Sequence, residues 1–534
     1  NSSVFRDTKI EGLLGLVNPV VFGTFLAAFF ALPLLALLTL SLSGNGEYFA
    51  HIASTRLPHF LYESGQLAVI SGMAAALIGV ASAWLITRFD FPGRNILSWL
   101  LILPLAMPGY VAAYSWYSLT APGGKMVSSI GFSLPTVSGV FGAGFVFAFT
   151  LYPYVYLLAR NAMEVHGGLI WDISRSLGAD PKRVFLKIIL PLIWPSVAAG
   201  SALVVMEVLA DFGVSDFLGV STLTVGIVRA WSSFGDPAAA AQLAVVLLFG
   251  ALLVLGVERN ARGRRQFTNS SQNHNMNIPR VRIRGFYAFV VCILGSLPFV
   301  LGLFIPALHL SWLAFETHPA ISIVPAIKGT VILAFVSGIM AVVLGVSAAY
   351  ALRSGNKVAQ VCIRFVQSGY AVPGAVSAIA ILSLLVFVQT TLNKLVSLPI
   401  SMLTGGSIIA LLIAYQSRFA AVAILPSETA LMKVEKRIDE AARILGAKQM
   451  FVITKIHFPL VLTGLATAAL LVAVEVMKEL PATMILRPFS LETLAVTAHT
   501  FASDERLPQA AFPSLALVLI CVPATALLNL LRPR

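Results

Sequence analysis

Charged residues are scarce in this chain of 534 residues, because only 11% are Asp, Glu, Lys or Arg whereas 58% are hydrophobic. This balance excludes a soluble multidomain protein of ordinary composition. Cysteine is scarce too: Cys292, Cys362 and Cys521 lie in or beside apolar stretches and far apart in the sequence. Their spacing fits neither a disulfide framework nor a metal site, so we expect them to be packing residues.

Sequence motifs of common enzyme classes are absent as well. The chain has no P-loop of the form Gly-x-x-x-x-Gly-Lys-Ser/Thr, no His-Glu-x-x-His zinc motif, no nucleophile elbow and no kinase signature. We therefore predict that the chain is not an enzyme by itself, that it binds no ATP through a P-loop, and that it holds no tightly bound cofactor.

Long apolar runs are abundant. Each is about twenty residues or longer, which at about 1.5 Å per residue is enough to cross a hydrocarbon core of about 30 Å. Twelve such runs lie near 17–41, 62–87, 96–119, 136–159, 190–211, 238–257, 286–313, 326–352, 363–390, 403–425, 459–481 and 511–531. The first is followed by eleven more, which favours a spanning helix over a removed signal. The predicted fold class is an all-α polytopic membrane protein.

Lysines and arginines are unevenly distributed among the predicted loops. When alternate loops are assigned to alternate sides, most of the 36 basic residues fall on one side. The other side receives Arg56, Lys125, Arg229, Lys328, Lys394, Arg487 and Arg506, while Arg418 and Lys478 fall within spans. Basic residues concentrate in cytoplasmic loops, so we predict that both termini are cytoplasmic. The net charge of +13 then reflects topology, and we expect no nucleic-acid partner.

A polar segment on the basic side occurs twice. Residues 172–191 and 440–459 each contain an acidic residue, a glycine six positions later, an isoleucine sixteen later and a proline nineteen later. The offset of 268 continues beyond the loops, since Glu207 corresponds to Glu475 and Asp211 to Glu479. The chain is therefore two copies of one unit.

The repeat predicts how the chain is divided. A polar stretch rich in Arg, Asn and Ser separates the copies, and we expect it to be a flexible cytoplasmic linker. The predicted parts are a first transmembrane half at 1–257 with its repeated loop at 160–191, the linker at 258–285, and a second half at 286–534 with its loop at 426–459.

Proline and glycine interrupt the same span in both halves. Pro108 and Gly109 lie in the third apolar run, and Pro373 and Gly374 lie in the corresponding run of the second half. Proline kinks a helix, and such kinks in membranes are tolerated beside other helices or a cavity. Paired kinks suit either a shared central pathway or ordinary kinked packing.

Each repeated loop has the pattern of a helix, a turn and a second helix. In the first loop Gly178 provides a helix stop and Asp180-Pro181 a helix start, and Pro191 then begins the next span. A short amphipathic helix of this kind can lie in lipid headgroups. Because the arrangement occurs twice, a partner with two-fold symmetry is the other interpretation.

These loops resemble the EAA motif, Glu-Ala-Ala-x3-Gly-x9-Ile-x-Leu-Pro, of membrane subunits in binding-protein-dependent ABC importers. The second loop matches closely with Glu440-Ala441-Ala442, Gly446, Ile456 and Pro459, although Phe458 replaces Leu. The first has Asp172-Ile173-Ser174 but keeps the later positions. The residues that the resemblance assigns to ATPase coupling are Asp172, Gly178, Ala179, Ile188, Pro191, Glu440, Ala441, Ala442, Gly446, Ala447, Ile456 and Pro459.

A fused chain with two such halves is similar to the ferric-iron permeases of that superfamily, above all along 207–213, 222–231 and 478–488. The resemblance implies a type I importer in a bacterial inner membrane. An ATP-binding subunit dimer would dock on the two loops, and a periplasmic binding protein would deliver Fe3+ to the opposite mouth. Related fused permeases carry thiamine, polyamines or aminoalkylphosphonates, and a gradient-driven secondary transporter is an alternative of a different class.

Four carboxylates in spans are the candidate cargo residues. Glu207 and Asp211, like Glu475 and Glu479, are spaced i, i+4 and therefore share one face of a helix. A charge at a span centre costs about 2.5 to 3.5 kcal/mol on insertion scales, so such residues generally face a cavity. Hard oxygen ligands suit a highly charged cation, and we expect them to pass Fe3+ inward. The alternative is that these acids pair with Lys478 or cap helix ends.

Overall fold

The chain folds almost entirely into helices, as the composition predicts. The structure is a computed structural model, and it describes residues 18–43, 47–122, 135–262, 280–317, 322–396, 406–447 and 451–530. The first half contains α1 (Pro19–Ser43), α2 (Glu47–Thr55), α3 (Leu57–Arg88), β1 (Phe89–Asp90), α4 (Arg94–Leu100), η1 (Leu103–Ala106), α5 (Gly109–Thr120), α7 (Gly139–Ser176), α8 (Pro181–Val184), η2 (Phe185–Ile189), α9 (Leu190–Ala210), α10 (Gly213–Phe217), α11 (Leu223–Ser232) and α12 (Pro237–Arg262).

The second half repeats this order. Its elements are β2 (Val281–Arg282), α13 (Phe286–Phe299), η3 (Val300–Phe304), α14 (Ile305–Glu316), α15 (Val324–Arg353), α16 (Lys357–Gln367), η4 (Ser368–Ala371), α17 (Gly374–Val396), α18 (Ile408–Met432), α19 (Lys436–Ile444), η5 (Val452–His457), α21 (Phe458–Lys478), α22 (Pro481–Leu486), α23 (Leu494–Ser503) and α24 (Leu507–Leu530).

The number of membrane spans agrees with the prediction. Within the described ranges eleven helices are long and apolar enough to cross a membrane, or twelve if one bent pair forms a single span. That pair, Arg94–Ala106 and Gly109–Thr120, is bent by 94°. The expected kink at Pro108 is thus a right-angle turn, and the expected span at 363–390 likewise begins only at Gly374. Proline without an N–H explains why the helix breaks at these points.

The two halves exchange their first helices. α1 packs against α16 and α17 of the second half, while η3 and α14 pack against α7 and α5 of the first. Glycine permits the close approach, because a Cβ at Gly302 in η3 would overlap the carbonyl oxygen of Phe149 in α7. Each half therefore completes the packing of the other.

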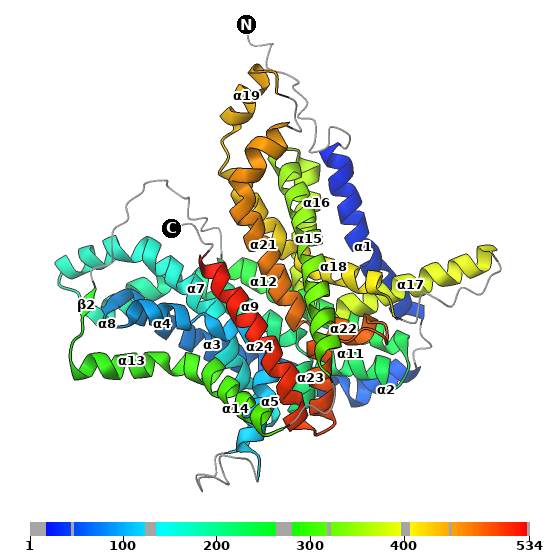
Figure 1. The fold of residues 1–534 in the computed structure, drawn as a ribbon, viewed down its shortest axis with the longest axis horizontal. Coiled ribbons are helices and arrows are strands. Elements are labelled where there is room, and N and C mark those ends of the chain that lie inside the picture. The colour runs from blue at the N-terminus through cyan, green and yellow to red at the C-terminus, as the bar shows by residue number, and fades with distance from the viewer. Residues whose placement is uncertain are drawn as a thin grey trace.

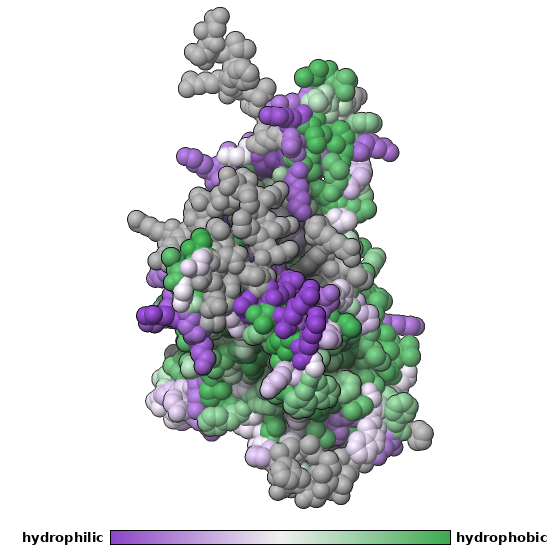
Figure 2. All heavy atoms as spheres, turned by 90° about the vertical axis from the view of Figure 1, so that its left-hand side faces the viewer, coloured by the Kyte–Doolittle hydropathy of each residue, from purple (hydrophilic) through white to green (hydrophobic). Residues whose placement is uncertain are grey.

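The ends that carry the repeated loops lie apart. In Figure 1 the two halves converge around α5 and α23, whereas α8 and α19 lie at the tips of two diverging arms. Large apolar side chains such as Phe25, Leu77 and Phe335 are well exposed on the outer faces of the spans, as expected for contact with lipid. Seen from the left-hand side of Figure 1, hydrophilic residues gather near the middle of the face and hydrophobic surface lies below them (Figure 2).

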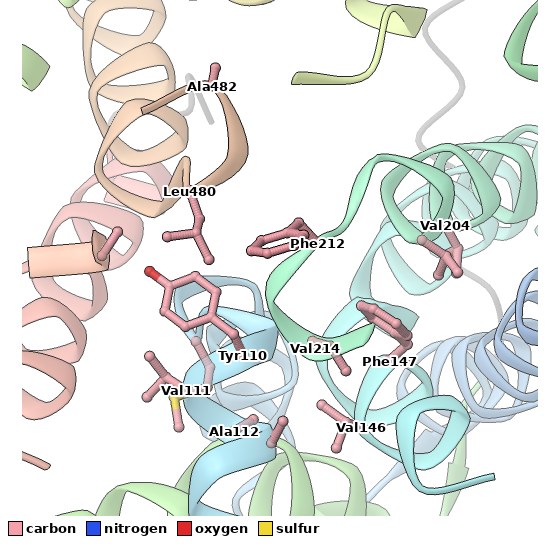
Figure 3. Packing of buried hydrophobic residues seen from close by; sticks show 14 of the residues in the cluster. Tyr110, Val111, Ala112, Val146, Phe147, Val204, Phe212, Val214, Leu480 and Ala482 are labelled. Atoms are coloured by element: carbon pink, nitrogen blue, oxygen red, sulfur yellow. The ribbon is translucent and has the colours of Figure 1, made fainter. Parts of the chain in front are cut away.

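Apolar side chains from both halves meet at this convergence. Leu480, which follows α21, points toward Tyr110 of α5 and Phe212 of the first half (Figure 3). All three are at most 3% exposed. A Cβ at Gly213 would lie 2.8 Å from atoms of both Leu480 and Tyr110, so only glycine fits there. This contact fixes the short segments after α9 and α21 against each other.

A π-helical turn precedes a proline at three sites. η2, η3 and η5 each end two residues before a proline, at Pro191, Pro306 and Pro459 respectively. A proline ring clashes with the carbonyl four residues earlier in an α-helix, and a π turn changes the hydrogen-bonding partner there. Our expectation that Pro191 and Pro459 begin the spans is therefore wrong, since the spans begin at Lys182 and Val452.

The predicted linker is partly ordered. Its first residues, to Arg262, continue α12, and its strand β2 pairs in parallel with β1 of the first half. The amide of Ile283 also donates to the carbonyl oxygen of Asp90 at 2.9 Å. Helix and strand are thus described at both ends of the predicted linker 258–285, and residues 263–279 lie outside the described part of the chain.

Candidate functional site

The two repeated loops differ in local structure. In the first, α7 runs from the span without interruption to Ser176, so the short separate helix expected at 172–177 is the end of a 38-residue helix. The turn follows at Gly178, whose φ of +79° is in the left-handed region that favours glycine. Ala179 then leads to α8, while Ile188 in η2 and Pro191 are exposed. Asp172 lies in α7, near its end.

The second loop is a separate element. α19 contains Glu440, Ala441 and Ala442, and the turn at Gly446 has φ +76°. Ala442, Gly446, Ala447 and Ile456 together with Leu445 and Phe451 line a hollow of about 460 Å³, and Pro459 is exposed just beyond it. Four of the predicted coupling residues are therefore brought to one concave surface.

Polar contacts hold α19 against the spans. Asp439 receives a hydrogen bond from Arg353 at 2.9 Å and lies 2.6 Å from Nε2 of His457, whose Nδ1 lies 2.5 Å from the Tyr350 hydroxyl. Trp171 and Ile189 occupy the places of Asp439 and His457 in the first half. The second loop is thus anchored by charged groups that the first copy does not contain at these positions.

The predicted cargo carboxylates meet at the centre of the molecule. Glu207, Asp211, Glu475 and Glu479 all line one cavity of about 100 Å³, together with Arg418 and Lys478. Two of these acids come from each half, at positions related by the offset of 268. The internal symmetry of the chain therefore produces a cluster that no single half contains.

Asp211 and Glu479 cap short helices. α9 ends immediately before Asp211, whose Oδ2 accepts hydrogen bonds from the amides of Val214 and Ser215 at 2.9 and 3.2 Å. Glu479 follows the end of α21 in the same way and accepts from Ala482 at 3.1 Å. A carboxylate at a helix N-terminus satisfies amides that lack helical partners. The alternative that these acids cap helix ends thus describes this pair.

Glu207 and Glu479 share one arginine. Arg418 of α18 places Nη2 3.3 Å from Glu207 Oε2 and Nη1 3.4 Å from Glu479 Oε1, and its side chain is 9% exposed. The Tyr370 hydroxyl donates to Glu207 at 2.7 Å. Arg418 lies 211 residues from Glu207, and sequence spacing could not pair them. An arginine within an apolar run was the available signal, since buried charges in membranes need partners.

Lys478 forms an ion pair with Glu475, as Arg418 does with Glu207 and Glu479. Its Nζ lies 3.1 Å from Glu475 Oε1, as the pairing alternative expects, and donates to the carbonyl oxygen of Leu105 in the first half at 3.3 Å. Both cations therefore come from the second half and reach groups of the first. The cavity thus contains four carboxyl groups and two cationic side chains.

The kink residues lie beside this cluster. Pro108 and Gly109 line the cavity itself. Gly374 is buried behind it, where an added Cβ would overlap Oε1 of Glu479 and lie 3.2 Å from Nη1 of Arg418. Pro373 is buried next to Gly374. The break in each span thus frees space for charged groups at the centre.

A preformed metal centre is not part of this arrangement. Among the residues that the structure describes, no group of three or more His, Cys, Asp or Glu is placed to hold a metal ion. The carboxylates instead form ion pairs with Arg418 and Lys478 and accept hydrogen bonds from backbone amides.

Comparison with known proteins identifies relatives for both halves. The family model for the binding-protein-dependent transport system inner membrane component matches residues 75–266 and 341–534. The Fe(3+)-transport system permease protein FbpB 2 of Haemophilus influenzae is 24% identical over 472 residues, which are 87% of this chain and 88% of that protein.

Shorter relatives match about a third of the chain. The sulfate transport system permease protein CysT of Salmonella typhimurium is 28% identical over 197 residues, 36% of this chain and 71% of its own length. A probable molybdenum ABC transporter permease protein of Haloferax volcanii is 28% identical over 192 residues, 35% of this chain and 70% of its own length. The matches therefore include proteins named for Fe(3+), for sulfate and for molybdenum.

Proposed function

The chain belongs to the binding-protein-dependent transport system inner membrane components, as a permease with two copies of that domain, and from this we infer that it carries ferric iron for an ATP-driven importer. It is a multi-pass membrane protein of an ABC importer. We expect it in a bacterial inner membrane, with the repeated loops in the cytoplasm and the α11 and α23 end in the periplasm.

The observation that carries the substrate assignment is the meeting of four acids in one cavity. Glu207, Asp211, Glu475 and Glu479 outnumber the two cations beside them. Carboxylate oxygens are hard ligands that attract highly charged cations. A relative that is similar over 87% of the chain is named for Fe(3+), which supports the same cargo. Ferric iron would be cargo that passes through and not a resident cofactor.

The partners follow from the loops. We expect an ATP-binding subunit against each loop, with the hollow beside Gly446 receiving part of the second one. Apolar side chains at both loops, including Leu177, Ile444 and Leu445, are more than 80% exposed and suit burial against a protein. A binding protein would deliver cargo at the opposite end. Co-purification of the tagged chain with an ATP-binding subunit tests the first of these contacts.

Uptake of radiolabelled iron tests the cargo assignment. The quadruple variant E207Q/D211N/E475Q/E479Q should lose most iron uptake while it still reaches the membrane and assembles with its ATPase. A control variant, D90N, neutralises a half-exposed acid that lies outside the cavity and away from both loops, and it should transport normally. Undiminished uptake in the quadruple variant would remove the four acids from the route.

An oxyanion is the second candidate cargo. Arg418 and Lys478 line the same cavity, and relatives are named for sulfate and molybdenum transport. If the cations bind cargo, labelled sulfate or molybdate should accumulate and iron should not. The same preparation assayed with all three solutes decides between the candidates. Uptake that continues without ATP and collapses with the ion gradient would instead indicate a secondary transporter.

A further inference from the structure

We propose that Arg418 is a tethered counter-ion that an arriving cation must displace from Glu207 and Glu479, and that it thereby restricts the route to cations of high charge. The proposal rests on the proposed cation cargo and names the residue that sets its specificity.

The geometry places Arg418 where a cation would bind. Its two terminal nitrogens face carboxylates from different halves, Glu207 at 3.3 Å and Glu479 at 3.4 Å. These distances are at the long end for charged hydrogen bonds, and neither contact is bidentate in the close fork geometry that makes arginine pairs strong. Its Nε has no hydrogen-bond partner among the described residues. The guanidinium is therefore held by charge more than by fitted hydrogen bonds.

The cations break a symmetry that the acids obey. At the offset of 268, Thr150 stands in the first half where Arg418 stands in the second, and Ala210 stands where Lys478 does. Thr150 lines the same cavity, so the missing cation is a difference in the site and not in the fold. One half supplies acids alone, and the other supplies acids with their counter-ions.

An incoming cation can displace Arg418 only if it gains more free energy from the carboxylates than Arg418 loses. In a site of low dielectric, a cation gains from the carboxylates in proportion to its charge, and Arg418 must lose its own ion pairs when it moves aside. A monovalent ion replaces one positive charge with another and gains little. A trivalent ion gains several times more from the same oxygens. The cavity of about 100 Å³ has room for a small cation with attached waters.

Displacement of Arg418 would also change the contact between the two halves. Arg418 belongs to the second half and Glu207 to the first, so an arriving cation replaces an ion pair that joins them. Tyr370, which donates to Glu207, lies in η4 immediately before the break at Gly374. Cargo in the cavity would therefore act on the contact between the two halves, which has to loosen if the cavity is to open first to one side of the membrane and then to the other.

Terbium binding to the purified full chain in detergent tests the proposal. Tb3+ is a hard trivalent cation whose luminescence is sensitised by nearby tyrosines, and Tyr110 and Tyr154 line the cavity. R418T installs the residue of the first half and should bind Tb3+ at least tenfold more tightly than the unmodified chain. Mn2+ should compete for Tb3+ poorly in the unmodified chain and well in R418T. R418T/E207Q should lose most of the gain.

A second variant, expected to weaken Tb3+ binding, keeps the proposal testable if R418T does not fold. T150K adds a cation at the symmetric position without removing an ion pair, and should weaken Tb3+ binding at least tenfold. Equal Tb3+ affinity in R418T, T150K and the unmodified chain would overturn the proposal. So would sulfate binding that is present in the unmodified chain and lost in R418T, because Arg418 would then be an anion ligand.

The outcomes separate this proposal from the proposed function. If the quadruple acid variant loses iron uptake but R418T binds Tb3+ no better, the counter-ion proposal fails and the iron assignment stands. If R418T binds Tb3+ as expected but the quadruple variant still takes up iron, the cavity selects cations yet is not the iron route.

Discussion

Gly374→Ala is a small change that should have a large effect. The new Cβ would overlap Oε1 of Glu479 and lie 3.2 Å from Nη1 of Arg418. The Glu479 side chain is 2% exposed, so its carboxylate can move only within the cavity that it lines. It must move away from Arg418 and from the amide of Ala482. The substitution therefore disturbs a buried ion pair and a helix cap without deleting either.

The structure sets the size of the effect. Disrupting one partner of a buried pair costs roughly 3 to 5 kcal/mol, and losing a helix cap costs about 0.5 to 2 kcal/mol. These costs overlap, because one carboxylate carries both, so we expect about 3 kcal/mol or more. At the roughly 2 to 4 °C per kcal/mol that holds for domains of 150 to 250 residues, a cost of about 3 kcal/mol lowers the melting temperature by about 6 to 12 °C.

The first half offers a matched control. Gly109 is the counterpart of Gly374, and a Cβ there would lie 3.0 Å from Cγ2 of Val214, a side-chain methyl group that can shift. Gly109→Ala should therefore cost less than about 1 kcal/mol, since alanine also favours a helix over glycine by about that amount. The assay is the fraction of tagged chain that elutes as a monodisperse peak after heating, measured for both variants.

A double variant tests whether displacement of Glu479 is the cause of the lost stability. If Gly374→Ala acts by displacing Glu479, its effect in an E479A background should be small, because the displaced group is gone. Equal melting temperatures for G374A and G109A would refute the packing argument. A full effect of G374A in the E479A background would assign the loss to another contact.

Two further predictions concern the ends of the molecule. Gly178 and Gly446 have positive φ, so G178V/G446V should strain both loops and lower ATP-driven uptake several-fold, while the chain still inserts into the membrane. The control G219V changes a glycine with φ +75° that lies away from the loops, and it should leave the coupling of ATP hydrolysis to uptake unchanged. Normal uptake by G178V/G446V would contradict the docking role of the loops. Burial lowers the pKa of His499, although Asp216 at 3.7 Å opposes this, so protonation of His499 is less favourable in the folded chain than in the unfolded chain. The stability of the fold should therefore decrease as the pH drops below about 6.5, and H499Q should reduce this decrease in melting experiments. A pH profile of H499Q identical to that of the unmodified chain would contradict this expectation.

Part of this protein is determined by the sequence alone. Apolar runs must cover their backbone polar groups within helices in a membrane, which is why the number of spans could be predicted closely. The repeat at an offset of 268 and the EAA-like loops depend on residue identity at fixed spacing. Both turn glycines, Gly178 and Gly446, adopt the positive φ that their position as helix stops requires.

Other features were decided by tertiary structure. Proline predicts a break near Pro108 but not its angle of 94°, and the local pattern predicts neither the continuation of α7 through the first loop nor the pairing of β1 with β2. The charge balance of the cavity is of the same kind. Glu207 has no basic residue close to it in the sequence, and its partner Arg418 arrives only when α18 packs against the first half. Spacing along one helix fixes which face an acid occupies, but the counter-ion of a buried charge is set by which helices meet there.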